Sequence, residues 1–311
     1  MTDYFEPLRY VVPPEEDGWL LNTILRRRMA LSRRLVTRLK GTERGITVNG
    51  ERRWTNTRVS AGDIVEIRME REESDDILPQ PIPFDMIYED EHLLIVNKAA
   101  GLVVHPTRGH YTNTLANGVV HYWRERGENC RFCPVHRLDR ETSGVLAIAK
   151  NAFVHRHISE QMKANRTLKQ YVAVVHGVLP MERGTIRAAI GRSPENPNVR
   201  IVLEEGPPAV THFEVVERYR FATQIRVRLE TGKTHQIRVH LKSLGHPLIG
   251  DKMYGLNANS GADPAEPSLI DRHALHAERL GFEHPVAGRW MEFAAPLPED
   301  MERLLRKLSE A

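Results

Sequence analysis

An abrupt change of composition over residues 72–84, with the sequence EESDDILPQPIPF, constrains the fold of this chain more than any other feature. The segment holds four acidic residues and three prolines. Each proline fixes its own φ and lacks a backbone N–H, so the segment suits a semi-extended linker better than a packed element. We therefore expect two domains that meet here and move relative to each other, with the Pro-rich linker itself at residues 77–84.

Basic residues are concentrated ahead of this linker. Residues 18–71 contain 13 Lys and Arg against 5 Asp and Glu, a net charge of +8, whereas the rest of the chain carries −5. A run of cations is often only a solvated face, and composition alone leaves that interpretation open beside phosphate binding. If the segment binds phosphate, Arg33, Arg34, Arg38 and Lys40 are the residues that we expect to contact it.

Apolar spacing in the same region predicts two helices packed on a small sheet. One helix begins within residues 19–25, and Ser32 is a suitable N-cap for a second helix that ends near Gly41. Residues 45–50 read as a strand ending in an Asn-Gly hairpin turn, and residues 62–68 as another strand. We assign residues 18–76 to this small α/β domain and residues 1–17 to an N-terminal extension.

The segment 136–150, HRLDRETSGVLAIAK, brings one carboxylate together with two arginines just ahead of a short apolar run. Residues 145–149 have the length and composition of a buried strand, and the preceding Thr-Ser-Gly is typical of the turn that bounds one. Asp139 therefore lies on a loop that enters a strand, where catalytic groups are common. Arg137 and Arg140 can keep it charged and offer donors to phosphate. From spacing alone, a turn-capping Asp beside two solvated arginines remains the more common explanation.

Residues 85–311 combine strand and helix patterns. Strands are predicted at 86–88 and 93–97 on either side of a turn, and again at 171–175 and 224–230. Apolar residues at a spacing of four predict one helix over residues 154–162, and Thr234 is the expected N-cap of another. We expect an α+β architecture with a mixed, largely antiparallel sheet.

Five sequence blocks occur in the order found in the RluA-type pseudouridine synthases, and the chain resembles that family. The blocks are NKAAGLVVHP at 97–106, HRLDRETSG at 136–144, KQYVAVVHG at 169–177, TGKTHQIRVHL at 231–241 and ALHA at 274–277. The resemblance spans roughly residues 85–298 and implies the pseudouridine synthase fold. Two positions depart from the family pattern: Ala99 stands where Pro is usual, and Lys233 replaces a planar, bidentate Arg by a point charge.

The resemblance also implies the site residues. Asp139 matches the catalytic carboxylate, which either attacks the ribose or base as a nucleophile or removes a sugar proton as a general base; the sequence leaves both routes open. Arg238 matches its ion-pair partner, and Tyr171 matches a tyrosine whose ring stacks on uracil. Arg137 matches an arginine that fills the gap left by a flipped nucleotide. Without the resemblance, Arg238 would be interpreted as an exposed helical arginine, Tyr171 as a core residue and Arg137 as a surface base. The histidines of the blocks are assigned no catalytic role.

The order of elements in residues 18–76 resembles the S4 RNA-binding domain. This likeness favours phosphate binding over a merely solvated face. Phosphate contacts hold RNA without reading its sequence, and they weaken as salt is added. We therefore expect the small domain to bind the RNA backbone without recognising its sequence.

Composition and motifs disfavour several other classes of protein. With 41% hydrophobic and 27% charged residues, no run of 18 apolar residues and no secretory signal, the chain is expected to be cytoplasmic and free of membrane. Cys130 and Cys133 form a single Cys-x-x-Cys without the further ligands of a zinc site, so we expect reduced thiols without a role. No Gly-rich phosphate loop or dinucleotide fingerprint is present, and we expect neither cofactor nor metal.

These features predict a cofactor-independent isomerase that converts uridine to pseudouridine in structured RNA. The expected substrate is 23S ribosomal RNA, with transfer RNA as the main alternative, and we expect a monomer. A non-catalytic RNA-binding or ribosome-assembly factor is a second hypothesis, which the complete set of Asp139, Tyr171 and Arg238 disfavours. An Asp-dependent nucleosidase that releases uracil is a third, and it would have little need of the +8 domain.

Overall fold

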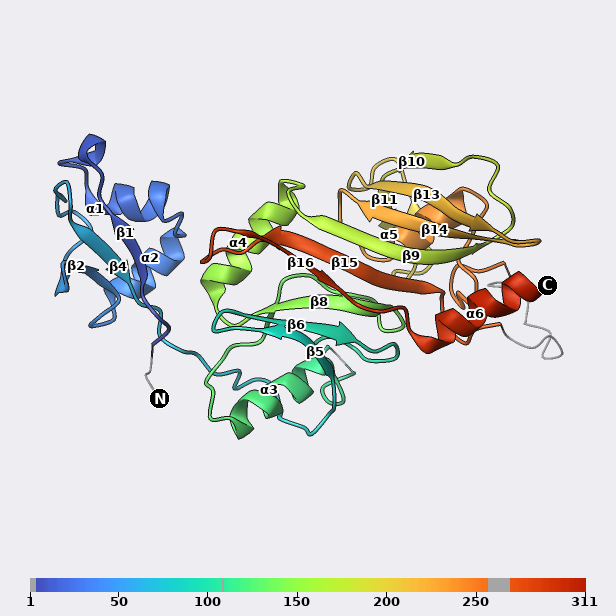
Figure 1. The fold of residues 1–311 in the computed structure, drawn as a ribbon, viewed down its shortest axis with the longest axis horizontal. Coiled ribbons are helices and arrows are strands. Elements are labelled where there is room, and N and C mark those ends of the chain that lie inside the picture. The colour runs from blue at the N-terminus through green and yellow to red at the C-terminus, as the bar shows by residue number, and fades with distance from the viewer. Residues whose placement is uncertain (1–3, 108, 257–268) are drawn as a thin grey trace.

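The chain, seen in a computed structural model that describes residues 4–107, 109–256 and 269–311, has a small N-terminal part beside a large part (Figure 1). In the small part, two helical segments pack on a four-stranded sheet of order β1-β4-β2-β3. The helical segments are α1 (Leu21–Thr23), which continues as a π-helical turn (Ile24–Arg28), and α2 (Arg33–Lys40). The strands are β1 (Leu8–Val11), β2 (Ile46–Val48), β3 (Glu51–Arg52) and β4 (Ile64–Ile67).

Local sequence signals account for most of this small domain. Ser32 caps α2 by accepting the Leu35 N–H at 3.0 Å, and Gly41 is the residue that follows the helix, as predicted. Asn49 and Gly50 both have positive φ, as a type I′ hairpin requires, and they join β2 to β3. Strand β1 lies within residues 1–17, the segment assigned to an extension, yet it pairs with β4 along its length. It is four residues long and is followed closely by two prolines, so its periodic signal in the sequence is weak.

The large part is built on a mixed sheet of order β10-β13-β14-β9-β15-β8-β6-β5, in which β7 also pairs with β8 and β16 also pairs with β15. In the described part of the chain β15 pairs with β8 in parallel and the other pairings are antiparallel, which confirms the predicted α+β class and the largely antiparallel sheet. The strands are β5 (Asp85–Glu89), β6 (Leu93–Lys98), β7 (Cys133–Pro134), β8 (Ser143–Ala149), β9 (Leu168–His176), β10 (Arg183–Arg187), β13 (Val210–Arg218), β14 (Ala222–Leu229), β15 (Leu275–Glu283) and β16 (Trp290–Ala294).

Among the described residues of the large part, four helices and a short separate strand pair accompany the sheet. The helices are α3 (Leu115–Glu125), α4 (Ala152–Lys163), α5 (Gln236–Ser243) and α6 (Glu299–Glu310), and the pair is β11 (Ile190–Arg192) with β12 (Arg200–Val202). Helix α4 confirms the helix expected over 154–162. The expected cap Thr234 is wrong: α5 is preceded by His235, and the Gln236 side chain closes the turn by accepting the Lys233 N–H at 2.9 Å. None of the helices in the described ranges is long and apolar enough to cross a membrane.

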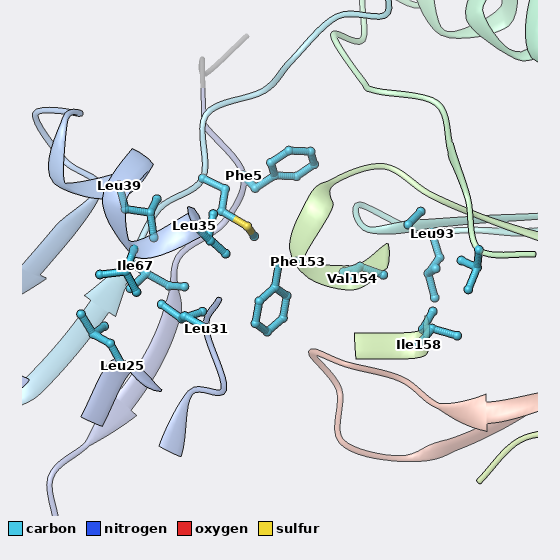
Figure 2. Packing of buried hydrophobic residues seen from close by; sticks show 14 of the residues in the cluster. Phe5, Leu25, Leu31, Leu35, Leu39, Ile67, Leu93, Phe153, Val154 and Ile158 are labelled. Carbon is cyan, nitrogen blue, oxygen red and sulfur yellow. The ribbon is translucent and has the colours of Figure 1, made fainter. Parts of the chain in front are cut away.

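One apolar cluster spans the boundary between the two parts. Phe153, near the start of α4, lies between Leu31 and Leu35 of the small domain and the rest of α4 (Figure 2). Nearby, Arg71 donates a hydrogen bond to Glu91 of the large part at 3.0 Å. Burial of Phe153 against both parts removes apolar surface from water only while they stay together. These contacts therefore oppose the relative motion expected from the linker.

The linker segment itself is extended but tied to the large part. Residues 77–84 form neither helix nor strand, as predicted. Ile77, however, is buried in the core beneath α3, and the Asn117 side chain on that helix donates to the Leu78 carbonyl at 2.7 Å. The prolines therefore prevent regular structure without leaving the segment loose.

Phe153→Ala should loosen the small domain from the large one. Truncating a buried Phe costs about 3–5 kcal/mol, and here much of that loss falls on the boundary. We expect a lower free energy of unfolding and faster amide exchange in α2, measured by native-state hydrogen exchange. Phe221→Ala, at a site 41% exposed, is the control and should change neither. Equal exchange rates in α2 of the two variants would contradict a docked small domain.

Candidate active site

A cavity of about 1100 Å³ in the large domain collects residues from four of the five sequence blocks. Arg137 and Asp139, from one block, line it together with Tyr171 and Arg238 from two distant blocks. The fifth block, at residues 274–277, begins strand β15 beside β8 and β9. The sheet order therefore explains why these distant blocks share one site.

The Thr-Ser-Gly that follows Asp139 locks its loop onto the chain around β15. The Thr142 N–H donates to the Asp139 carbonyl at 3.1 Å, which closes a four-residue turn. The hydroxyls of Thr142 and Ser143 hydrogen-bond to the rings of His273 at 2.8 Å and His276 at 2.9 Å. Gly144 has a φ of +113°, and a Cβ there would lie 2.1 Å from a backbone oxygen of β15, so only glycine fits.

Lys98 connects the loop that follows β6 to the Asp139 loop through hydrogen bonds. Its buried ammonium donates to the carbonyls of Ala99 at 2.7 Å, Leu102 at 2.9 Å and Arg140 at 3.0 Å. Burial lowers the pKa of Lys98 to about 7, although three carbonyl acceptors favour the charged form. Because Lys98 uses the carbonyl of Ala99, the departure from proline at that position leaves the tie intact.

Asp139 forms an ion pair with Arg238, whose guanidinium is shared with a second carboxylate. Arg238 Nη1 lies 3.1 Å from Asp139 Oδ2, while its Nε and Nη2 donate to the two oxygens of Asp251 at 2.7 and 2.8 Å. The Asp139 side chain is 25% exposed and faces the cavity, whereas the Asp251 side chain is fully buried. Burial acts to raise the pKa of Asp251, but hydrogen bonds and charge from Arg238 outweigh it and hold that pKa below its usual value.

His235 approaches Asp139 from another direction. Its Nε2 lies 3.9 Å from Asp139 Oδ2, beyond hydrogen-bond range, and its Nδ1 is 2.9 Å from the Tyr254 hydroxyl. Burial lowers the pKa of His235, and the charge of Asp139 only partly opposes this shift. His235 also has a φ of +58°, a left-handed conformation that costs energy for a residue with a side chain and that is common at functional sites.

Tyr171 lies on β9 and presents a buried phenol to the same cavity. Its neighbours across the sheet are Val227 on β14 and Ala277 on β15. Burial, followed by the charge of Asp139, raises the pKa of Tyr171, so its hydroxyl stays protonated at neutral pH and is available as a donor.

The arginines named from the sequence differ in how free they are. Arg137 lines the cavity, is exposed, and has no ion-pair partner in the described part of the chain. Arg140 is less available, because its side chain donates to the Gly101 carbonyl. A free cation such as Arg137 on the wall of a cavity suits phosphate binding.

On α2 of the small domain, Arg33, Arg34 and Lys40 are exposed. Arg38, by contrast, forms an ion pair with Glu72, which also binds Arg131. Arg38 is therefore partly neutralised, which makes it a poorer phosphate ligand than sequence alone indicated. The cause lies in the acidic residues that precede the linker, because Glu72 lies against α2.

Sequence reasoning missed several residues of the site. Asp251, Tyr254 and the contact made by His235 were not anticipated. Gly250-Asp251 after an apolar pair is typical of a turn. This signal predicts the turn but does not indicate that Asp251 binds Arg238, 13 residues earlier. Contacts of this kind arise only once the chain is folded.

The described residues offer neither a cluster of metal-ligating side chains nor an ionised thiol. Within the described ranges, no group of three or more His, Cys, Asp or Glu side chains could hold a metal ion. Cys130 and Cys133 are free thiols, and burial raises the pKa of each to about 11, so both remain protonated.

Comparisons with known proteins agree with this fold and site. A family model described as RNA pseudouridylate synthase matches residues 92–243. The chain is 42% identical over 266 residues to the RNA pseudouridine synthase YlyB of Bacillus subtilis, covering 85% of each chain. It is 38% identical over 302 residues to ribosomal large subunit pseudouridine synthase D of Neisseria meningitidis serogroup A, covering 96% of this chain and 80% of that one. The solved structure of human RNA pseudouridylate synthase domain containing 4 shares the fold, with a TM-score of 0.59 at 21% identity over 72% of this chain and 93% of that one.

The chain belongs to the RNA pseudouridine synthase family, whose members isomerise uridine in RNA. Within this family it is of the RluA type, as its five sequence blocks indicated. The RNA isomerase class and the pseudouridine synthase fold expected from the sequence are thereby confirmed.

His273 should make folding stability fall between pH 7 and pH 5. Burial lowers the pKa of His273 to about 4 in the folded protein, against about 6.5 for an unperturbed His. Between these values the unfolded chain binds a proton that the folded chain does not, so stability falls as pH falls. The contribution at pH 5 is about 2 kcal/mol. Between pH 7 and pH 5, the free energy of unfolding of His273→Asn, measured in urea, should fall by about 2 kcal/mol less than that of the unmodified protein. The exposed-site control His110→Asn should show the same slope as the unmodified protein. Equal slopes in all three proteins would be the contrary result.

Proposed function

We propose that this isomerase modifies uridines of large-subunit ribosomal RNA and that Asp139 is its catalytic carboxylate. The observation that carries the proposal is the position of Asp139 on the wall of the cavity. Arg238 holds its carboxylate, and Tyr171 lines the same cavity. The ribosomal substrate is supported by relatives named as ribosomal large subunit synthases, which match most of this chain.

The proposed reaction breaks the bond from ribose to uracil N1, turns the base, and forms a bond from the same ribose carbon to uracil C5. The proton displaced from C5 moves to N1, so substrate and product are isomers. A carboxylate that attacks as a nucleophile and one that removes a sugar proton must both begin ionised. The Arg238 guanidinium donates a hydrogen bond to the Asp139 carboxylate at 3.1 Å. The ring of Tyr171 supports the base, and its protonated hydroxyl is a donor close to the reacting groups.

Arg137 and the small domain would hold the RNA. Taking a nucleotide out of its stack costs a few kcal/mol, and an exposed guanidinium beside the cavity can fill the gap and bind phosphate. The small domain, which we assign to the S4-like class, presents Arg33 and Arg34 on α2 as phosphate ligands. Its docking against α4 fixes this basic face relative to the cavity.

Asp139→Asn should abolish isomerisation while RNA affinity stays within about twofold. The substitution keeps size and shape but removes the charge, and losses of catalytic carboxylates reach about 10⁴-fold in kcat. Single-turnover assays of pseudouridine formation measure the loss, and filter binding measures RNA affinity. Asp85→Asn, at an exposed position on β5, is the control and should retain full activity.

The same assays separate the competing functions. Release of free uracil by the unmodified protein would point to a nucleosidase, and binding without either product would point to an assembly factor. Pseudouridine mapping in cells with and without the protein tests the substrate. Sites lost from transfer RNA alone would contradict the ribosomal assignment.

Arg33→Gln combined with Arg34→Gln should weaken RNA binding and reduce its dependence on salt. Each lost phosphate contact lowers the slope of log K against log salt by about 0.7–0.9, so the double variant should lose about 1.5 in slope. Arg303→Gln combined with Arg306→Gln removes the same charge from α6, at the opposite end of the molecule, and serves as the control (Figure 1). An identical slope in both double variants would refute a phosphate grip on α2.

A further inference from the structure

The turn at residues 250–254 contacts Arg238 and His235, the two side chains that approach Asp139, although no reaction step uses the turn. Asp251 accepts two hydrogen bonds from Arg238, and its Oδ1 also accepts the N–H groups of Met253 and Tyr254 at 3.0 Å. Its carboxylate is thus occupied on both oxygens and is sealed from solvent. Such a group is fixed in place by the turn that carries it.

The turn can adopt only a narrow range of conformations. Gly250 has a φ of +72°, and a Cβ there would lie 2.2 Å from the Arg272 carbonyl oxygen. Tyr254 is 1% exposed, and its hydroxyl accepts the Arg200 N–H at 2.8 Å. The Arg238 guanidinium also lies over the Tyr254 ring, 4.9 Å from its centroid. Asp251 and Tyr254 therefore hold Arg238 at its edge and at its face.

The hydroxyl of Tyr254 also sets the orientation of His235. A phenol oxygen that accepts the Arg200 N–H can donate its own proton to His235 Nδ1, 2.9 Å away. The imidazole proton then resides on Nε2, which faces Asp139 at 3.9 Å. One short turn thereby controls the N–H groups on two sides of the carboxylate.

We propose that Asp251 and Tyr254 are positioning residues, which act through Arg238 and His235 to hold the carboxylate of Asp139 in its reactive orientation. The proposal rests on Asp139 being the catalyst. Neither residue touches the substrate. Their contribution is to keep donors fixed that would otherwise rotate, and misplacement of a group by about 1 Å can cost about 10²-fold in rate.

Asp251→Asn tests the first contact. The amide replaces one acceptor oxygen by an N–H₂ that faces the N–H groups of Arg238, so the two-bond grip is lost. We expect kcat per folded molecule to fall about 10–100-fold, with KM for RNA within about twofold. Folded protein is quantified by near-ultraviolet circular dichroism, and Asp85→Asn again serves as the control.

A double-mutant cycle asks whether Asp251 acts through Arg238. Lysine cannot bind Asp251 with two parallel bonds and reach Asp139 as well, so Arg238→Lys removes the same arrangement. Asp251→Asn should then cost little more in the Arg238→Lys background. Fully additive losses in kcat would overturn the proposal, because they would mean that Asp251 contributes independently of Arg238.

Tyr254→Phe tests the contact between the Tyr254 hydroxyl and His235. This test remains valid even if Asp251→Asn fails to fold. Loss of one hydroxyl should lower kcat about 3–10-fold, the effect of one hydrogen bond of about 1 kcal/mol. It should also raise the pKa of His235, followed by NMR, because a donor to the neutral ring is removed. Tyr219→Phe, which removes a buried hydroxyl bound to Glu217, is the matched control.

The outcomes separate this proposal from the assignment of Asp139. If Asp139→Asn is inactive but Asp251→Asn and Tyr254→Phe keep the kcat of the unmodified enzyme, the positioning role is wrong and the catalyst stands. Full activity of Asp139→Asn would remove the basis of both. An unchanged His235 titration in Tyr254→Phe would also overturn the role of Tyr254.

Discussion

The site depends on one guanidinium placed between two carboxylates. Arg238 is buried, and an unpaired charge at such a place would be expensive, so its pairing with Asp251 is a condition of folding. Burial acts to lower the pKa of Arg238, yet Asp251 and Asp139 together raise it above its ordinary value. Because Asp251 accepts hydrogen bonds from Nε and Nη2 of Arg238, the orientation of the guanidinium is fixed. Its Nη1 then points to Asp139.

The sheet makes this meeting possible. The Asp139 loop enters β8, Tyr171 lies on β9, and β15 runs between these two strands. Gly144 permits the close approach of β8 to β15, and the hydroxyls of Thr142 and Ser143 hold the loop against the chain around β15. The motif around Asp139 therefore determines packing as well as the position of the carboxylate. Thr142, Ser143 and Gly144 hold the loop in a defined position, and Asp139 forms the ion pair with Arg238.

The sequence predicted those parts of the molecule that depend on local signals. The Ser32 cap, the Asn49-Gly50 hairpin and the strand after Asp139 follow from side-chain chemistry within a few residues. Strand β1 was missed because its partner β4 lies more than fifty residues away and its own pattern is only four residues long. The cap of α5 was misassigned because the helix begins one residue later than expected, after His235 in a left-handed conformation, and no side chain caps its first turn.

The candidate site divides in the same way. Asp139, Tyr171 and Arg238 could be named because each stands in an ordered block of the family pattern, although their roles remain proposals. Asp251 could not be named, since its significance lies in a contact across the fold with Arg238. Arg38 shows the converse error, because a cation counted as free in the sequence is paired with Glu72, which precedes the linker. Charge in a sequence limits what a surface can bind, but ion pairs formed on folding decide which charges remain available to RNA.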